Sequence, residues 1–123
     1  MITFNQDRPI YLQISDRICD EILAGKYAAD QRIPSVRDYA AFLQVNTNTA
    51  VKAYEDLSRK EIIYQRRGMG YFVSAGAYDA ITKDRQVQFK EMSRKQLFRD
   101  MDLLGITIDD VVKEYNEWKG QKG

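Results

Sequence analysis

The sequence predicts a mainly helical protein with one small β-hairpin. Two observations support this fold class, and composition and length are consistent with it. Apolar residues recur at helical spacing in several segments, and one run rich in β-branched and aromatic residues surrounds a Gly-x-Gly turn. The composition, with 44% hydrophobic and 30% charged residues, is that of a globular protein. A length of 123 residues fits one compact domain or a small domain with an appendage.

The composition also excludes several classes of function. No apolar run approaches the roughly 20 residues that span a bilayer, and the first seven residues lack the features of a signal peptide. We therefore expect a cytoplasmic protein without membrane contact. The chain has no histidine and a single cysteine, Cys19, so the commonest general base, Cys-x-x-Cys metal pairs and internal disulfides are all missing. We expect a binding protein with no cofactor, no metal and no enzymatic activity.

The first predicted helix runs from Ile10 to about Gly25. Isoleucines at every fourth position form an apolar stripe, and Pro9 and Gly25 suit the two ends of the helix. Cys19 lies on or near this stripe, and we interpret it as a small buried hydrophobic residue. A polar loop, residues 26–33, is expected to follow.

Two shorter helices are predicted next. Ser35 is suited to cap the first of them, whose apolar residues are Val36, Tyr39, Ala40 and Leu43. Asn46 is suited to cap the second, which runs from Thr47 to about Lys60 and has the buried stripe Ala50, Ala53, Tyr54 and Leu57. At about 100° per residue, Asn48 and Lys52 fall on the opposite face. Two short helices with a tight connection indicate a helix-turn-helix.

Residues 62–73 predict a β-hairpin with two arginines, Arg66 and Arg67, near its turn. A three-helix unit that ends in a basic hairpin is a winged helix-turn-helix, which we assign to residues 1–76. Residues 77–123 predict a separate segment of two helices, from about Tyr78 to Leu104 and from Thr107 onward, with a frayed tail at 120–123. Large apolar residues in this segment need a partner surface, because two helices alone bury little.

The chain resembles the GntR family of bacterial transcription regulators over residues 9–75. Four segments carry the resemblance in order and spacing, namely Pro9-Ile10-Tyr11-Leu12-Gln13-Ile14, Ile33-Pro34-Ser35-Val36-Arg37, residues 45–54 (VNTNTAVKAY) and Arg67-Gly68-Met69-Gly70-Tyr71-Phe72-Val73. The short C-terminal segment resembles the YtrA subfamily, whose members have a two-helix dimerisation segment. Asp30 stands where the family usually has glycine.

The resemblance implies a DNA-binding repressor that acts as a homodimer on a pseudo-palindromic, double-stranded operator. A small-molecule effector is compatible with it, although no residue indicates its identity. The candidate DNA contacts are Ser35, Arg37, Asn46, Thr47, Asn48, Thr49, Lys52, Arg67, Gly68 and Gly70. The candidate dimer contacts are Phe89, Met92, Leu97, Met101, Leu104, Val112, Tyr115 and Trp118.

Several of these residues have a purely structural alternative. Ser35 and Asn46 can serve only as helix caps, Arg37 can be an ordinary solvated charge, and Gly68 and Gly70 can serve only as turn residues. The apolar residues of the tail can line a ligand pocket instead of an interface. For the whole protein, the alternative is a winged-helix adaptor that binds another protein and no DNA. Low-salt binding to duplex DNA distinguishes the adaptor from the regulator.

Overall fold

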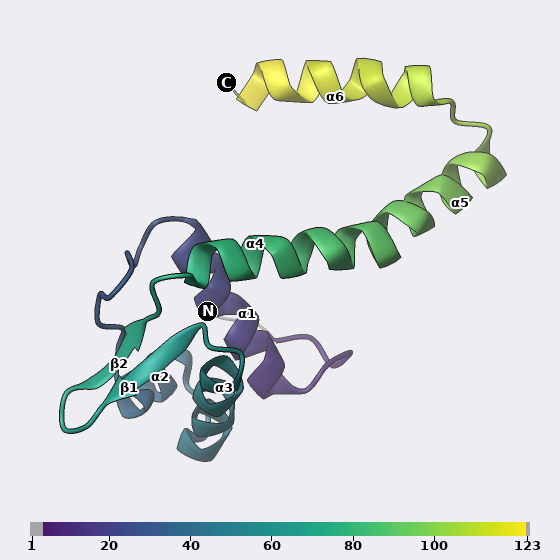
Figure 1. Ribbon diagram of the computed structural model, residues 1–123. Coiled ribbons are helices and arrows are strands. Elements are labelled where there is room, and N and C mark those ends of the chain that lie inside the picture. Colours follow the sequence, from purple (N-terminus) through teal and green to yellow (C-terminus); the bar gives the residue numbers. More distant parts are fainter. Residues whose placement is uncertain (1–3, 123) are drawn as a thin grey trace. The chain divides into compact units, whose positions relative to one another are not determined.

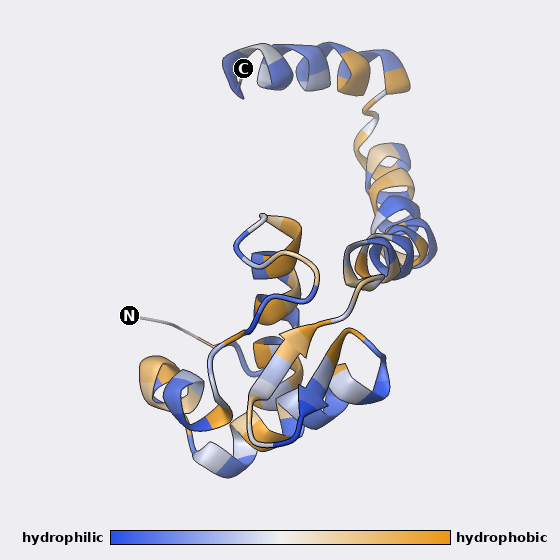
Figure 2. Ribbon diagram, turned by 60° about the vertical axis from the view of Figure 1, so that its left-hand side comes forward, coloured by the Kyte–Doolittle hydropathy of each residue, from blue (hydrophilic) through white to orange (hydrophobic). Residues whose placement is uncertain are grey.

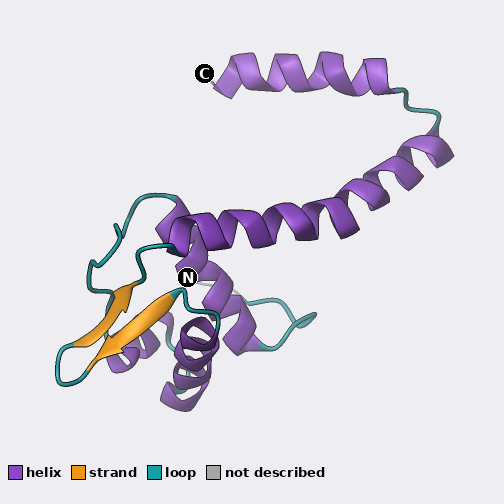
Figure 3. Ribbon diagram, viewed as in Figure 1, coloured by secondary structure: helices purple, strands orange, loops and turns teal. Residues whose placement is uncertain are grey.

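The computed structural model describes residues 4–122, and the chain divides after Lys83 into two compact units. The elements, drawn in Figures 1 and 3, are in order α1 (Ile10–Leu23), α2 (Val36–Leu43), α3 (Thr47–Arg59), β1 (Ile63–Arg66), β2 (Gly70–Val73), α4 (Ala77–Gln88), the π-helix η1 (Phe89–Ser93), α5 (Arg94–Leu104) and α6 (Ile108–Lys122). This confirms the predicted fold class, a mainly helical chain with one antiparallel hairpin.

The predicted caps start α2 and α3. The Ser35 hydroxyl accepts a hydrogen bond from the Asp38 amide at 3.1 Å, and the Asn46 side-chain oxygen accepts one from the Asn48 amide at 2.8 Å. Both bonds satisfy amides that have no partner within their own helix. Gln44 adopts a left-handed conformation with φ +58° and ends α2, which makes the connection between the two helices short.

Small residues bring α1 and α3 close together. Ala50 and Ala53 on α3 are fully buried, and the buried Ser15 on α1 has its hydroxyl 3.2 Å from the Ala53 carbonyl oxygen. Without bulky side chains between them, the two helices pack at close range. The isoleucine stripe of α1 is buried in the core as predicted, and so is Cys19.

The hairpin has a third strand-like neighbour that the sequence did not predict. Residues 30–33, expected to lie in a polar loop, run along β2: the Asp30 amide donates to the Val73 carbonyl at 2.7 Å, and the Ile33 amide donates to the Tyr71 carbonyl at 3.0 Å. Arg32 forms an antiparallel bridge with Phe72. Asp30 has φ +63°, a left-handed conformation in which glycine is favoured and aspartate is tolerated. The glycine usual at this position in the resembled family therefore has a conformational reason.

Tyr54 connects α3 to two other segments of the first unit. Its side chain is buried, and its hydroxyl donates a 2.6 Å hydrogen bond to the Pro34 carbonyl, just before α2. Its ring meets the Tyr71 ring of β2 edge-on at 5.1 Å between centroids and lies 6.4 Å from the Tyr39 ring of α2. One side chain thus fixes the entry of α2 and the position of the hairpin relative to α3.

The core of the first unit extends beyond Gly76, the end that we predicted for the N-terminal domain. Ala77 and Ile81 of α4 are buried and belong to the same apolar cluster as the α1 isoleucines. The first turns of α4 are therefore part of this core, and the unit ends at Lys83.

The second unit contains η1, α5 and α6. Thr107 and Asp110 cap α6 reciprocally: the Thr107 amide donates to the Asp110 carboxylate at 3.0 Å, and the Asp110 amide donates to the Thr107 hydroxyl at 3.2 Å. The bond from the Thr107 backbone lowers the pKa of Asp110. The tail expected to fray at 120–123 is helical as far as Lys122, and Gly123 lies outside the described residues. Within residues 4–122, no helix combines the length and apolarity that crossing a bilayer requires.

We expect Tyr54→Phe to lower the free energy of unfolding by about 1–2 kcal/mol, because it leaves the Pro34 carbonyl without its partner. Urea unfolding followed by circular dichroism measures this change. Tyr78→Phe is the matched control, since the Tyr78 side chain is exposed. Equal stabilities of the two variants would contradict the role given to the Tyr54 hydroxyl.

Tyr39 and Tyr54 predict a loss of stability at high pH. Burial raises the pKa of both phenols above the ordinary 10.0, and for Tyr39 the hydrogen bond to Glu21 adds to this. The native state then keeps protons that the unfolded chain has released. The contribution of these two tyrosines to the free energy of unfolding should therefore be constant below about pH 10 and fall above it, by up to about 1.4 kcal/mol per pH unit for each tyrosine.

Urea titrations at about pH 8 and pH 11 measure this slope, and Tyr39→Phe should reduce it. An unchanged slope in Tyr39→Phe would show that this phenol ionises as easily in the native state as in the unfolded chain.

Candidate nucleic-acid interface

The start of α3 presents a row of small polar residues. Thr47 and Asn48 are exposed and Thr49 is half-buried, while Lys52 is exposed one turn after Asn48. The Asn46 side-chain oxygen is used in the cap. The side chains of Thr47, Asn48 and Lys52 make no hydrogen bond or ion pair with any residue in the described range 4–122. They stand at the positive end of the helix dipole, where anions are favoured.

The start of α2 adds one cation. Arg37 is exposed, and its guanidinium has no hydrogen bond or ion pair among the residues that the structure describes. The half-buried Ser35 caps the helix, as predicted. Its hydroxyl proton still leaves it able to donate one hydrogen bond.

The two adjacent arginines near the hairpin turn have different surroundings. The guanidinium carbon of Arg66 lies 4.7 Å from the centroid of the Phe72 ring, and its Nη2 donates to the Tyr64 hydroxyl at 3.2 Å. Arg67 is exposed in the turn and makes no such contact with a described residue. Arg67, which we preferred as a contact, is therefore the arginine whose charge is free to meet a ligand.

The two turn glycines are required for different reasons. Gly68 has φ +75°, and a Cβ built there would meet no atom within 4 Å, so only the backbone conformation calls for glycine. Gly70 has φ +99°, and a Cβ there would lie 3.1 Å from Nε of Arg32. Arg32 is exposed and was not among the predicted site residues.

All ten predicted DNA-contact residues lie in the first unit and are exposed or half-buried. They fall in three groups: the start of α2, the start of α3 and the hairpin turn. Tyr54 links the elements that carry the three groups, since it contacts the α2 entry and β2 from α3. The hairpin turn points away from α1 (Figure 1), so the turn is open to solvent.

The predicted dimer residues of the second unit are exposed with one exception. Met101 is buried, and the other seven, Phe89, Met92, Leu97, Leu104, Val112, Tyr115 and Trp118, are exposed. Phe98, Leu103 and Ile108 are exposed as well and were not predicted. The first turns of α6 carry apolar residues (orange in Figure 2) beside the acidic Asp109 and Asp110. The second unit therefore leaves an unusual amount of apolar surface uncovered.

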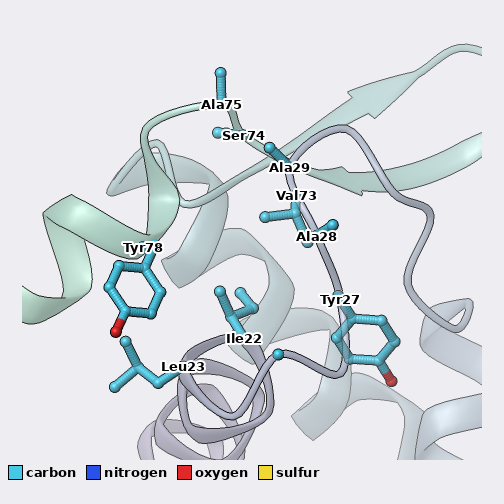
Figure 4. Close-up of a pocket in the computed structure, with 10 residues that line it drawn as sticks. Ile22, Leu23, Tyr27, Ala28, Ala29, Val73, Ser74, Ala75 and Tyr78 are labelled. Carbon is cyan, nitrogen blue, oxygen red and sulfur yellow. The ribbon is translucent and has the colours of Figure 1, made fainter.

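The first unit also contains a small apolar cavity of about 220 Å³ (Figure 4). Ile22 and Leu23 of α1, Tyr27, Val73 and Tyr78 line it, together with small residues. Its volume is below the roughly 300–1,000 Å³ of ordinary ligand pockets. None of the predicted DNA-contact residues lines this cavity, so the cavity is separate from the candidate interface.

Comparisons with known proteins agree with this geometry. The family model of bacterial regulatory proteins, gntR family, matches residues 10–73. The HTH-type transcriptional repressor YtrA of Bacillus subtilis is 33% identical over 110 residues, which cover 89% of this chain and 81% of that protein.

Two solved structures are similar as well. A GntR-family transcriptional regulator from Bacteroides thetaiotaomicron has a TM-score of 0.77 and 45% identity, covering 93% of this chain and 99% of its own. AraR(DBD) in complex with operator ORX1 has a TM-score of 0.56 and 29% identity, covering 60% of this chain and 95% of its own.

The family model spans more than half of the sequence, and the 33% identical relative aligns over most of its own length. The chain therefore belongs to the gntR family of bacterial regulatory proteins.

Proposed function

We propose that this protein is a sequence-specific DNA-binding transcription repressor that acts as a homodimer on a pseudo-palindromic operator. The observation that carries the proposal is the set of unpartnered polar side chains at the starts of α2 and α3 and at the hairpin turn. Exposed arginine, lysine and asparagine without protein partners, gathered on one packed unit, suit the phosphates and base edges of a duplex.

In this proposal the start of α3 enters the major groove. Asn48 is central on the outward face, and an asparagine amide can pair with both N6 and N7 of adenine. Thr47 and Thr49 flank it with hydroxyl groups that can donate or accept. Arg37 and Lys52 bind phosphates and set the register of the helix. The Arg67-Gly68 turn enters the adjacent minor groove, where the side-chain-free Gly68 lets the backbone come close.

The second unit joins two copies of the chain through its exposed apolar residues. A two-fold dimer presents two copies of α3, so the half-sites should lie about 34–36 Å apart or at a multiple of this distance. YtrA is named a repressor, and AraR(DBD) was solved with an operator; both relatives support a regulator that binds an operator.

Selection of duplexes from a random library, followed by affinity measurements at several salt concentrations, tests the proposal. We expect a two-fold symmetric consensus and an affinity that falls by orders of magnitude between about 50 and 200 mM salt. Failure to enrich any sequence, together with salt-independent binding, would refute the proposal and favour a protein-binding adaptor.

Asn48→Ala should relax the selected consensus at one position in each half-site. The expected cost is about 1–3 kcal/mol for each base that is no longer read, because the bidentate pair with the base disappears. Selection with the variant protein and affinity measurements on point-changed operators check this. Asn116→Ala, an exposed asparagine of α6, is the matched control. If Asn48→Ala keeps the wild-type consensus at full strength, Asn48 reads no base.

A chain that ends at Lys83 should be a folded monomer, since it keeps Ala77 and Ile81 in the core. The intact chain should sediment as a dimer and bind the full operator up to about 10²–10⁴-fold more tightly than the truncated chain, because the second half-site is then bound intramolecularly. A dimeric truncated chain, or one that binds the full operator as tightly as the intact protein, would assign dimerisation to the first unit instead.

A further inference from the structure

The side chain of Arg32 lies beside the hairpin with its guanidinium next to Gly70; we call this position the seat of Arg32. Its bridge to Phe72 adds residues 30–33 to the open edge of β2 and places the Arg32 and Phe72 side chains on the same face of the sheet. Gly70, two residues before Phe72, belongs to this face too. Arg32 is therefore held by the backbone pairing of a sheet, although the residue itself belongs to a connection between helices.

The guanidinium of Arg32 fills the space of the missing Gly70 side chain. A Cβ on Gly70 would lie 3.1 Å from Nε, 3.5 Å from Nη2 and 3.7 Å from Cζ of Arg32. Nε and Nη2 both lie nearer than Cζ, which means that the edge of the planar group carrying these two nitrogens is turned toward Gly70. The seat orients the group and reduces the freedom that an exposed arginine loses when it binds a ligand.

This charge has no protein partner. Arg32 is exposed, and its guanidinium makes no hydrogen bond or ion pair with any of the described residues, 4–122. The nearest acid in the sequence, Asp30, accepts a 2.7 Å hydrogen bond from the Tyr64 hydroxyl. Arg66 pairs with Gly70 across the hairpin and lies on the same face. Its guanidinium already contacts the Phe72 ring and donates to the Tyr64 hydroxyl. Arg32 therefore places on this face an oriented guanidinium that makes no hydrogen bond or ion pair with a described residue.

Arg32 lies between two groups of the candidate interface, the start of α2 and the hairpin turn. In the chain it stands three residues before Ser35, the cap of α2, and its side chain reaches Gly70, next to the exposed turn that carries Arg67 and Gly68. A duplex that touched both the start of α2 and the turn would pass close to Arg32. Guanidinium groups bind phosphate oxygens through paired N–H donors.

We propose that Arg32 is a further DNA contact, which binds a backbone phosphate from its seat over Gly70 and so positions the hairpin on the duplex. The inference rests on the proposed DNA-binding function. It gives Gly70 a second role, since a Cβ there would lie 3.1 Å from Nε and push the guanidinium aside by a few tenths of an ångström. A phosphate contact positions the protein and carries no sequence information.

The test uses the intact chain and a duplex selected from a random library with the wild-type protein. Arg32→Met keeps the length of the stem and removes the charge. It should lower affinity at least about tenfold at 0.1 M salt and reduce the slope of log affinity against log salt by roughly 0.9 for each phosphate that is no longer neutralised, or about 1.8 for a dimer. The selected consensus should not change. Arg32→Lys should restore most of the slope.

Arg94→Met, a change of the same type in the exposed α5, is the matched control and should leave the slope as it is. Gly70→Ala tests the seat. It should weaken binding when Arg32 is present and have a much smaller effect in the Arg32→Met background, because backbone strain at φ +99° is common to both backgrounds and cancels in the comparison. If Arg32→Met does not fold, as judged by its circular dichroism spectrum, Arg32→Gln replaces it in the same comparisons.

The outcomes separate this inference from the proposed function. If the wild-type protein enriches no duplex, the DNA-binding proposal itself fails. If the wild-type protein binds and Arg32→Met has the wild-type slope, or if Gly70→Ala costs the same in both backgrounds, DNA binding stands and the role of Arg32 is refuted.

Discussion

Tyr54 joins three segments that are far apart in the sequence. Its hydroxyl holds the Pro34 carbonyl at the entry of α2, and its ring lies against Tyr71 of β2 and near Tyr39 of α2. The three groups of the candidate interface sit on the elements that this side chain connects. Their common placement is therefore a property of the core, and the exposed residues can vary between relatives without changing how they are presented.

The close packing of α1 against α3 has a corresponding effect on the outer side of α3. Ala50, Ala53 and the Ser15 hydroxyl allow no bulky group between the helices, so α3 cannot rotate about its axis without a clash or a cavity. Because the buried face is fixed, the opposite face is fixed as well, and Asn48 and Lys52 stay in solvent. Readout by a few side chains depends on this kind of rigidity.

Local signals in the sequence were sufficient for most of the fold and for candidate site residues that the structure leaves exposed or half-buried. Caps such as Ser35 and Asn46 and the apolar spacing of α1 to α3 act over one or two turns, so the expected and observed helix ends nearly coincide. The pairing of residues 30–33 with β2 is long-range and has no apolar alternation to reveal it, which is why the position of Arg32 beside the hairpin was not predicted. Gly70 within a strand was the available signal, since glycine there often marks a close approach. No residue in the sequence indicated the π-helix.

The π-helix at Phe89–Ser93 is a wide turn that holds one residue more than a turn of α-helix. Its closing bond runs from the Arg94 amide to the Phe89 carbonyl, one residue further than in an α-helix. Loss of one residue here would convert the segment to ordinary α-helix, because the wide turn would lose its extra residue. The wide turn takes up that residue locally, so the helical residues before and after it keep nearly the same orientation about the helix axis. The length of this segment can therefore change by one residue at this turn while the helix stays continuous.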